Sequence, residues 1–137
     1  MVSSHLLDIR NTLPFEDATF DVVLDSYCLC HFIDLEEHSQ ILRECRRVLR
    51  PGGHFVSIQL SESDVYYRDR IESSLHYGHV SFDPCNEIRK LHFSPDSYLE
   101  VVPDGFMSYR PFVTNFWDQV NGFRYRRDVL GSVLTSV

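Results

Sequence analysis

Three side chains in the first quarter of the sequence could bind a ligand or move a proton. Asp8 ends one short apolar run, and Asp25 directly follows another, residues 20–24. His31 lies six residues beyond Asp25. A carboxylate at a strand end can accept hydrogen bonds from a ligand, and an imidazole can take up or release a proton near neutral pH. Asp25 and His31 are therefore the candidates for catalytic groups.

Each of these side chains also has a structural alternative. Asp8 could simply end a strand, and Asp25 could accept backbone N–H groups at the start of a helix. His31 could be a packed or surface histidine. Both interpretations stay open at this stage.

The four cysteines, at positions 28, 30, 45 and 85, do not form a metal-binding pattern. Cys28-Leu29-Cys30-His31 has its cysteines too close together for the usual zinc spacing, and further ligands are missing. Cys28 and Cys30 follow an apolar run, where a reduced cysteine behaves as a small hydrophobe. We expect no metal site and no disulfide.

The first half of the chain predicts alternating strands and a helix. Residues 4–7 are a short strand candidate, and residues 11–19 are rich in turn formers. Residues 20–24, FDVVL, are a β-branched run typical of a strand buried on both faces. Residues 35–49 predict a helix, and residues 55–60, FVSIQL, a further strand.

The predicted helix has clear limits. Asp34 is placed to cap its start, with Glu37 three residues later in a capping-box pattern. Apolar residues recur on one face at three- and four-residue spacing, and Pro51-Gly52-Gly53 stops the helix. Two strands joined by a helical crossover imply parallel pairing, so the sequence predicts an α/β fold.

The second half gives weaker patterns. Residues 62–75 are a helix candidate, and residues 78–95 read as a long surface excursion. Residues 98–102 and 106–113 could form a hairpin around a Pro-Asp-Gly turn. Residues 116–137 show no clean period.

Composition narrows the function classes. The formal net charge is −7, from 20 acidic and 13 basic residues, which disfavours nucleic acid as a partner. The arginines between positions 43 and 50 are expected on the solvated face and C-terminal turn of the predicted helix. No apolar stretch is long enough for a membrane span, and no signal peptide is evident, so we expect a cytoplasmic protein.

The order of these motifs resembles the class I S-adenosylmethionine (SAM)-dependent methyltransferases, type 11-like. Asp8, Leu13-Pro14-Phe15 and Phe20-Asp21-Val22-Val23 are followed by Arg47-Val48-Leu49-Arg50-Pro51-Gly52-Gly53 and a strand. The resemblance covers residues 4–60. It implies a partial Rossmann-like methyltransferase sheet with parallel core strands. The hairpin expected from residues 98–113 would add a C-terminal antiparallel part to this α/β fold. Residues 1–137 would form a single, incomplete domain.

The resemblance also implies site residues. Asp8 would accept a hydrogen bond from the adenine amino group of SAM, and Ile9 would meet the adenine ring. Asp25 and Ser26, with Tyr27, would lie at the carboxyl end of a parallel strand, near the methionine part of SAM and the methyl acceptor. Residues 61–77 and 106–117 would shape the site for an acceptor that the sequence does not identify.

The glycine-rich turn that such enzymes use to hold SAM would precede Asp8, where this sequence has seven residues and no glycine. We therefore expect an incomplete domain whose isolated chain binds SAM poorly. The 20–24 strand would have an unpaired apolar edge, which favours an oligomer or a completing chain. The expected activity is methyl transfer; the alternative is a non-catalytic methyltransferase-like partner or scaffold protein.

Overall fold

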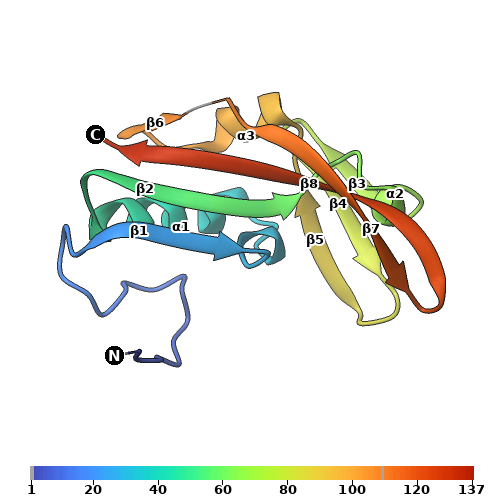
Figure 1. The fold of residues 1–137 in the computed structure, drawn as a ribbon, viewed down its shortest axis with the longest axis horizontal. Coiled ribbons are helices and arrows are strands. Elements are labelled where there is room, and N and C mark those ends of the chain that lie inside the picture. The colour runs from blue at the N-terminus through green and yellow to red at the C-terminus, as the bar shows by residue number, and fades with distance from the viewer. Residues whose placement is uncertain (1, 109) are drawn as a thin grey trace.

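The computed structural model describes residues 2–108 and 110–137, which form a five-stranded and a three-stranded sheet with helices packed against them (Figure 1). The strands are β1 (Phe20–Ser26), β2 (Leu49–Leu60), β3 (Ile71–Leu75), β4 (Gly78–Asp83), β5 (Ile88–His92), β6 (Phe106–Ser108), β7 (Phe112–Val120) and β8 (Phe123–Ser136). The helices are α1 (Leu35–Val48), α2 (Val65–Arg68), α3 (Pro95–Val101) and a 3-10 turn, η1 (Leu29–His31).

The predicted strand–helix–strand unit is confirmed. β1 and β2 pair in parallel, and α1 makes the crossover between them. Asp34 caps α1 by accepting the backbone N–H groups of Glu36 and Glu37 at 2.8 and 3.1 Å. Gly52 takes the left-handed conformation, φ +80°, inside β2, where the register with β1 shifts between Leu49 and His54.

The rest of the larger sheet is antiparallel, in the order β1-β2-β8-β6, with β7 paired to β8. The 14-residue β8 runs alongside β2 at its C-terminal end and alongside β7 at its N-terminal end (Figure 1). The mixed α/β fold with parallel core strands and a C-terminal antiparallel hairpin is therefore confirmed.

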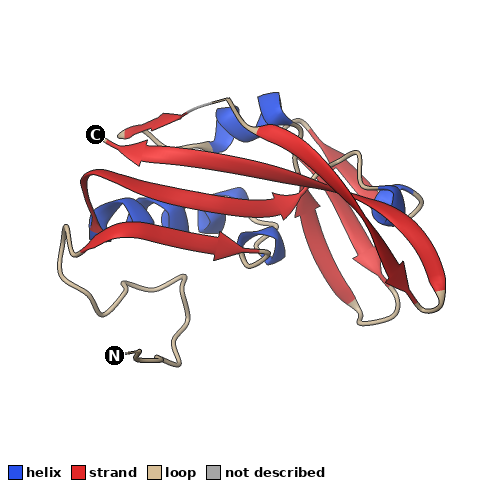
Figure 2. Cartoon of the chain, in the orientation of Figure 1, coloured by secondary structure: helices blue, strands red, loops and turns tan. Residues whose placement is uncertain are grey.

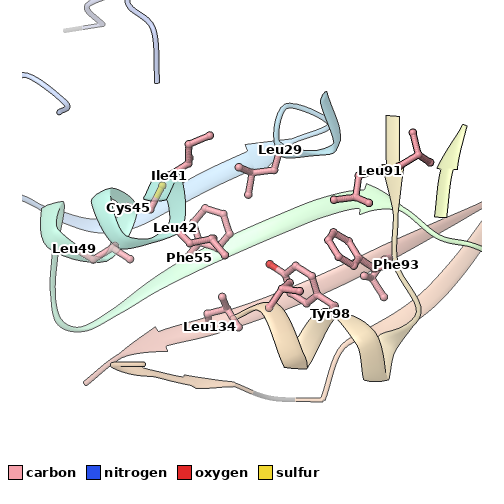
Figure 3. Packing of buried hydrophobic residues seen from close by; sticks show 13 residues of the cluster. Leu29, Ile41, Leu42, Cys45, Leu49, Phe55, Leu91, Phe93, Tyr98 and Leu134 are labelled. Carbon is pink, nitrogen blue, oxygen red and sulfur yellow. The ribbon is translucent and has the colours of Figure 1, made fainter. Parts of the chain in front are cut away.

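The main core lies between α1, α3 and the larger sheet. Ile41 and Leu42 of α1 and Tyr98 of α3 are almost fully buried, together with Phe55 of β2 and Leu134 of β8 (Figure 3). Residues from both halves of the sequence share this cluster, so the crossover is fixed by packing against the C-terminal strands.

Two predictions for the first half were wrong. Residues 4–7 form no strand; they lie in the N-terminal loop drawn in tan in Figure 2. β1 is not buried on both faces, since Val22 and Leu24 are 54% and 66% exposed. β2 is the only described strand that pairs with β1, and the face of β1 that carries Val22 and Leu24 remains open to solvent.

The second half contains more strand than predicted (Figure 2). Instead of one helix over 62–75, Asp64 caps the short α2 and β3 follows it. Instead of a surface excursion over 78–95, β4 and β5 pair with β3 to form the smaller sheet. Its strands have five or six residues each and are stabilised mainly by their neighbours, which a local pattern does not reveal.

The hairpin is also displaced from its predicted place. Residues 98–102 belong mostly to α3, whose N-cap Ser94 forms a capping box with Ser97. Residues 106–113 divide between β6 and β7, and Tyr109 lies outside the described residues. The actual hairpin joins β7 and β8 through a turn at Asn121-Gly122, in the stretch where no period was visible.

In the described part of the chain, no helix has the length and apolar character needed to cross a membrane.

Candidate functional site

The turn that follows β1 is held by Asp25. The parallel register sets Asp25 beside Ser57, whose hydroxyl donates to Asp25 Oδ2 at 2.7 Å. Asp25 Oδ1 accepts the backbone N–H groups of Cys28 and Leu29, both at 3.1 Å. Burial raises the pKa of Asp25, while these hydrogen bonds act against the rise. The carboxylate is thus engaged in the helix-start role that the sequence left open.

Tyr27 lies inside this turn in an unusual conformation. Its φ of +58° is in the left-handed region, which bulky side chains rarely occupy. Its backbone N–H donates to the carbonyl of Ile58 at 2.9 Å, which fixes the conformation. Such local strain is found most often at ligand sites and switches.

A cavity of about 200 Å³ opens on one side of the turn, and we call it the loop cavity. The N-terminal loop contributes Ile9 and Leu13, and the end of β1 contributes Asp25 and Ser26. The remaining walls come from β1, the turn, α1 and β2: Val23, Leu24, Cys28, Leu29, Ile41, Cys45 and Phe55. It is an apolar hollow at the carboxyl end of a parallel strand, where open α/β sheets bind their ligands.

Of the predicted cofactor residues, Ile9, Asp25 and Ser26 meet at the loop cavity, whereas Asp8 does not line it. Asp8 is exposed and forms an ion pair with Arg10, with 2.7 Å between Asp8 Oδ2 and Arg10 Nη2. Hydrogen bonds from Arg10 lower the pKa of Asp8 to about 2. Arg10 also reaches Glu37 at the start of α1, at 3.2 Å.

Two arginines have roles that the sequence analysis missed. Arg47 donates to the carbonyls of Leu13 and Phe15, at 3.0 and 2.8 Å, and so ties the N-terminal loop to α1. Arg46 donates to the carbonyls of Gly105 and Val137, both at 2.8 Å. These residues were expected on a solvated face; instead, Arg47 positions the loop that carries Ile9 and Leu13.

A second cavity, of about 280 Å³, lies on the other side of the turn, and we call it the hairpin cavity. The turn contributes Tyr27, Cys30 and His31. The other walls are Leu60, Tyr67, Lys90 of β5, and Phe116, Asp118 and Arg127 of the β7–β8 hairpin. Residues 27–31 therefore contribute to the walls of both cavities.

His31 is the predicted catalytic candidate that faces the hairpin cavity. Burial lowers its pKa, and the nearby ammonium group of Lys90 lowers it further, which favours a neutral imidazole. Lys90, Asp118 and Arg127 were not singled out from the sequence. They lie on β5, β7 and β8, and only the pairing of distant strands brings them to the turn.

Cys28, Cys30 and Cys45 have little thiolate character, because burial raises the pKa of each. All four cysteines are free, and burial raises the pKa of both Cys30 and Cys45 to about 12. Among residues 2–108 and 110–137, no group of three or more His, Cys, Asp or Glu side chains is arranged to hold a metal ion.

Comparison with known proteins shows that the first part of the chain is similar to methyltransferases. Residues 2–57 match the family model described as "Methyltransferase domain". The chain is 37% identical over 67 residues to the sterol 4-C-methyltransferase strm-1 of Caenorhabditis elegans, a match over 47% of this chain and 19% of that protein. It is 33% identical over 91 residues to a ubiquinone/menaquinone biosynthesis C-methyltransferase of Brucella anthropi, covering 66% of this chain and 32% of that protein.

Solved structures agree on the fold. A SAM-dependent methyltransferase of Methanosarcina mazei superposes with a TM-score of 0.71 at 18% identity, over 96% of this chain and 65% of that one. The N-methyltransferase NodS of Bradyrhizobium japonicum, solved with S-adenosyl-L-homocysteine, gives a TM-score of 0.54 at 16% identity, over 95% of this chain and 52% of that one. The chain thus spans less than two thirds of the length of each of these relatives.

Proposed function

We propose that this chain, whose residues 2–57 match a methyltransferase domain and whose fold resembles that of SAM-dependent methyltransferases, is the part of such an enzyme that positions a small-molecule acceptor for methyl transfer. A segment outside this chain would complete the cofactor site. The observation that carries the proposal is the meeting of Ile9, Asp25 and Ser26 at one apolar cavity.

The loop cavity has suitable chemistry for part of an adenosyl cofactor. Its apolar walls can exclude water and pack against a flat ring, while Asp25 and Ser26 bring polar atoms to the carboxyl end of β1. The same kind of cofactor is bound in the structural neighbour NodS, which was solved with S-adenosyl-L-homocysteine. When bound, SAM supplies a methyl group that its positive sulfur already makes reactive.

The residues of this chain would then mainly position the reactants. Asp25 holds the turn that borders both cavities, so its role is positioning rather than proton transfer. The acceptor would enter from the hairpin cavity, where a neutral His31 could take up the proton of an acceptor that arrives in its protonated form and so convert it to the anion. Alignment of acceptor and methyl group accounts for much of the rate in such transfers.

The free edge of β1 indicates where the rest of the domain would join. β2 occupies one edge, and no other described strand pairs with β1. Val22 and Leu24 leave an apolar surface beside the free edge. An additional strand pairing here would satisfy the open backbone groups, and a further element packed on the same face would cover both side chains. The relatives extend well beyond the part that this chain matches, which is consistent with such a segment.

Calorimetric titration with S-adenosylhomocysteine tests the proposal. The longer protein, carrying the sequence upstream of this chain, is expected to bind it, and Ile9→Ala should weaken binding about tenfold, or about 1.4 kcal/mol. Leu6→Ala is the matched control, because Leu6 is an apolar residue of the same loop that is fully exposed. Absence of binding by the longer protein, or equal effects of the two substitutions, would overturn the proposal.

A further inference from the structure

The hairpin cavity is built entirely from residues of this chain, unlike the proposed cofactor site. Its walls come from the turn, β2, α2, β5, β7 and β8, and its volume of about 280 Å³ suits a small ligand. It can therefore be studied without a completing segment.

The two cationic side chains that line this cavity, Arg127 and Lys90, differ in whether carboxylates neutralise them. Arg127 contacts two carboxylates, Asp64 at 2.9 Å and Asp118 at 3.2 Å. Asp64 is fully buried and also accepts the backbone N–H of Asp128. The guanidinium of Arg127 is thus a structural cation, held in place and largely neutralised.

Lys90 is different. Its ammonium contacts the hydroxyl of Tyr67 at 2.6 Å, and within the part of the chain that the structure describes it forms no ion pair. It is the only lysine among the 13 basic residues, in a chain of formal net charge −7. A cation without a counter-ion at the wall of a cavity attracts an anionic ligand, and the partly enclosed walls strengthen that attraction.

Aromatic side chains flank this cation. Tyr67 is 4% exposed and is held by the ring of His92, with centroids 5.0 Å apart. Phe116 and Tyr27 are 44% and 37% exposed, so parts of their rings remain free at the cavity. Such surfaces pack well against a planar ring.

We propose that the hairpin cavity binds the methyl acceptor as a planar organic anion, with Lys90 as its counter-ion and Phe116 and Tyr27 as the surfaces that contact its ring. That the bound anion is the methyl acceptor rests on the proposed function, whereas the presence of an anion site does not. The ligand class is therefore a small aromatic or conjugated molecule carrying a carboxylate, phenolate or enolate.

The single lysine makes a direct test practical. Labelling the chain with ¹⁵N-lysine gives one lysine side-chain signal in the NMR spectrum. The probes are 2-naphthoate and its neutral counterpart, 2-naphthamide. We expect naphthoate to shift the Lys90 signal and to bind at least about tenfold more tightly than naphthamide.

Variants separate the charge from general packing. Lys90→Met should remove the preference for naphthoate, and Lys90→Arg should retain it. Arg89→Met is the matched control. Arg89 pairs with Glu72 of β3, across the intervening β4, and does not line the cavity, so this substitution should leave the preference intact. Their binding is followed by tyrosine and tryptophan fluorescence, and thermal unfolding checks that each variant folds.

Three results would overturn the proposal: an unmoved Lys90 signal at millimolar naphthoate, equal affinity for the two probes, or an unchanged preference in Lys90→Met. None of these measurements uses SAM or methyl transfer. A failed S-adenosylhomocysteine titration with a successful naphthoate titration would therefore reject the proposed function alone.

Discussion

Tyr27 combines a strained backbone with a place on the wall of the hairpin cavity. Its neighbours explain how the strain is maintained: Asp25 fixes the following amides, and Ile58 accepts the N–H of Tyr27 itself. A left-handed conformation costs a non-glycine residue about 1–2 kcal/mol. The chain keeps this cost at a position that presents an aromatic ring to a cavity, which is consistent with a ligand-binding role.

Replacing Tyr27 by glycine and by alanine isolates this strain. Both substitutions remove the ring, but only alanine keeps the Cβ that opposes a positive φ. We expect Tyr27→Gly to be more stable than Tyr27→Ala by about 1 kcal/mol, measured by urea unfolding. At ordinary positions the order is reversed, so an alanine variant as stable as the glycine variant would show that Tyr27 is unstrained.

Among the elements, the smaller sheet depends on a very close approach of two strands. A Cβ at Gly78 of β4 would lie 2.3 Å from the backbone carbonyl oxygen of His92 on β5. Backbone atoms in a paired sheet cannot move aside easily, so only glycine fits here.

Gly78→Ala should therefore destabilise the protein by about 1–3 kcal/mol, read from the midpoint of urea unfolding. Gly131→Ala on β8 is the matched control. The atoms nearest its Cβ, at 2.6 Å, belong to the ring of Phe112, which is 56% exposed and can rotate away. Equal losses in the two variants would argue against the steric explanation.

The elements also show what the sequence could predict and what it could not. β1, α1 and β2 carry their own signals: a β-branched run, the Asp34 cap with an apolar helical face, and a glycine turn. The site residues Ile9, Asp25 and Ser26 followed from the resemblance and do meet at one cavity.

The second half could not be predicted in the same way, because its strands depend on distant partners. β8 carries four charged residues within Arg124–Asp128, which obscure a strand pattern. Its partner β2 lies more than 60 residues earlier in the sequence, whereas its partner β7 is joined to it by a tight turn. Lys90 reaches the site only because β5 folds back beside the turn. No local period records such pairings.

For the molecule as a whole, two buried histidines contribute to the loss of stability in acid. Burial lowers the pKa of His38 and of His92 to about 4, from 6.5. His38 packs against Phe93, and neither of its ring nitrogens has a hydrogen-bond partner among the described residues. The unfolded chain therefore takes up protons more readily than the folded chain between these pH values.

The stability contribution of each neutral histidine is fully present above pH 6.5 and is lost as the pH falls towards 4. His38→Leu should remove about 3 kcal/mol of this fall, which urea unfolding at a series of pH values would measure. His5→Leu, which replaces a histidine in the exposed N-terminal loop, is the matched control. A His38→Leu variant with the wild-type slope would contradict the assignment.

The turn of residues 27–31 borders both cavities, with Cys28 on one side and Tyr27, Cys30 and His31 on the other. If a ligand in one cavity moves this shared turn, its binding is coupled to binding in the other cavity. A movement of the turn that favours a ligand in one cavity changes the affinity of the other cavity for its own ligand. Thermodynamic reciprocity requires the same factor in both directions. In a completed enzyme, binding of the methyl donor would thus change the affinity for the acceptor, and binding of the acceptor would change the affinity for the donor by the same factor.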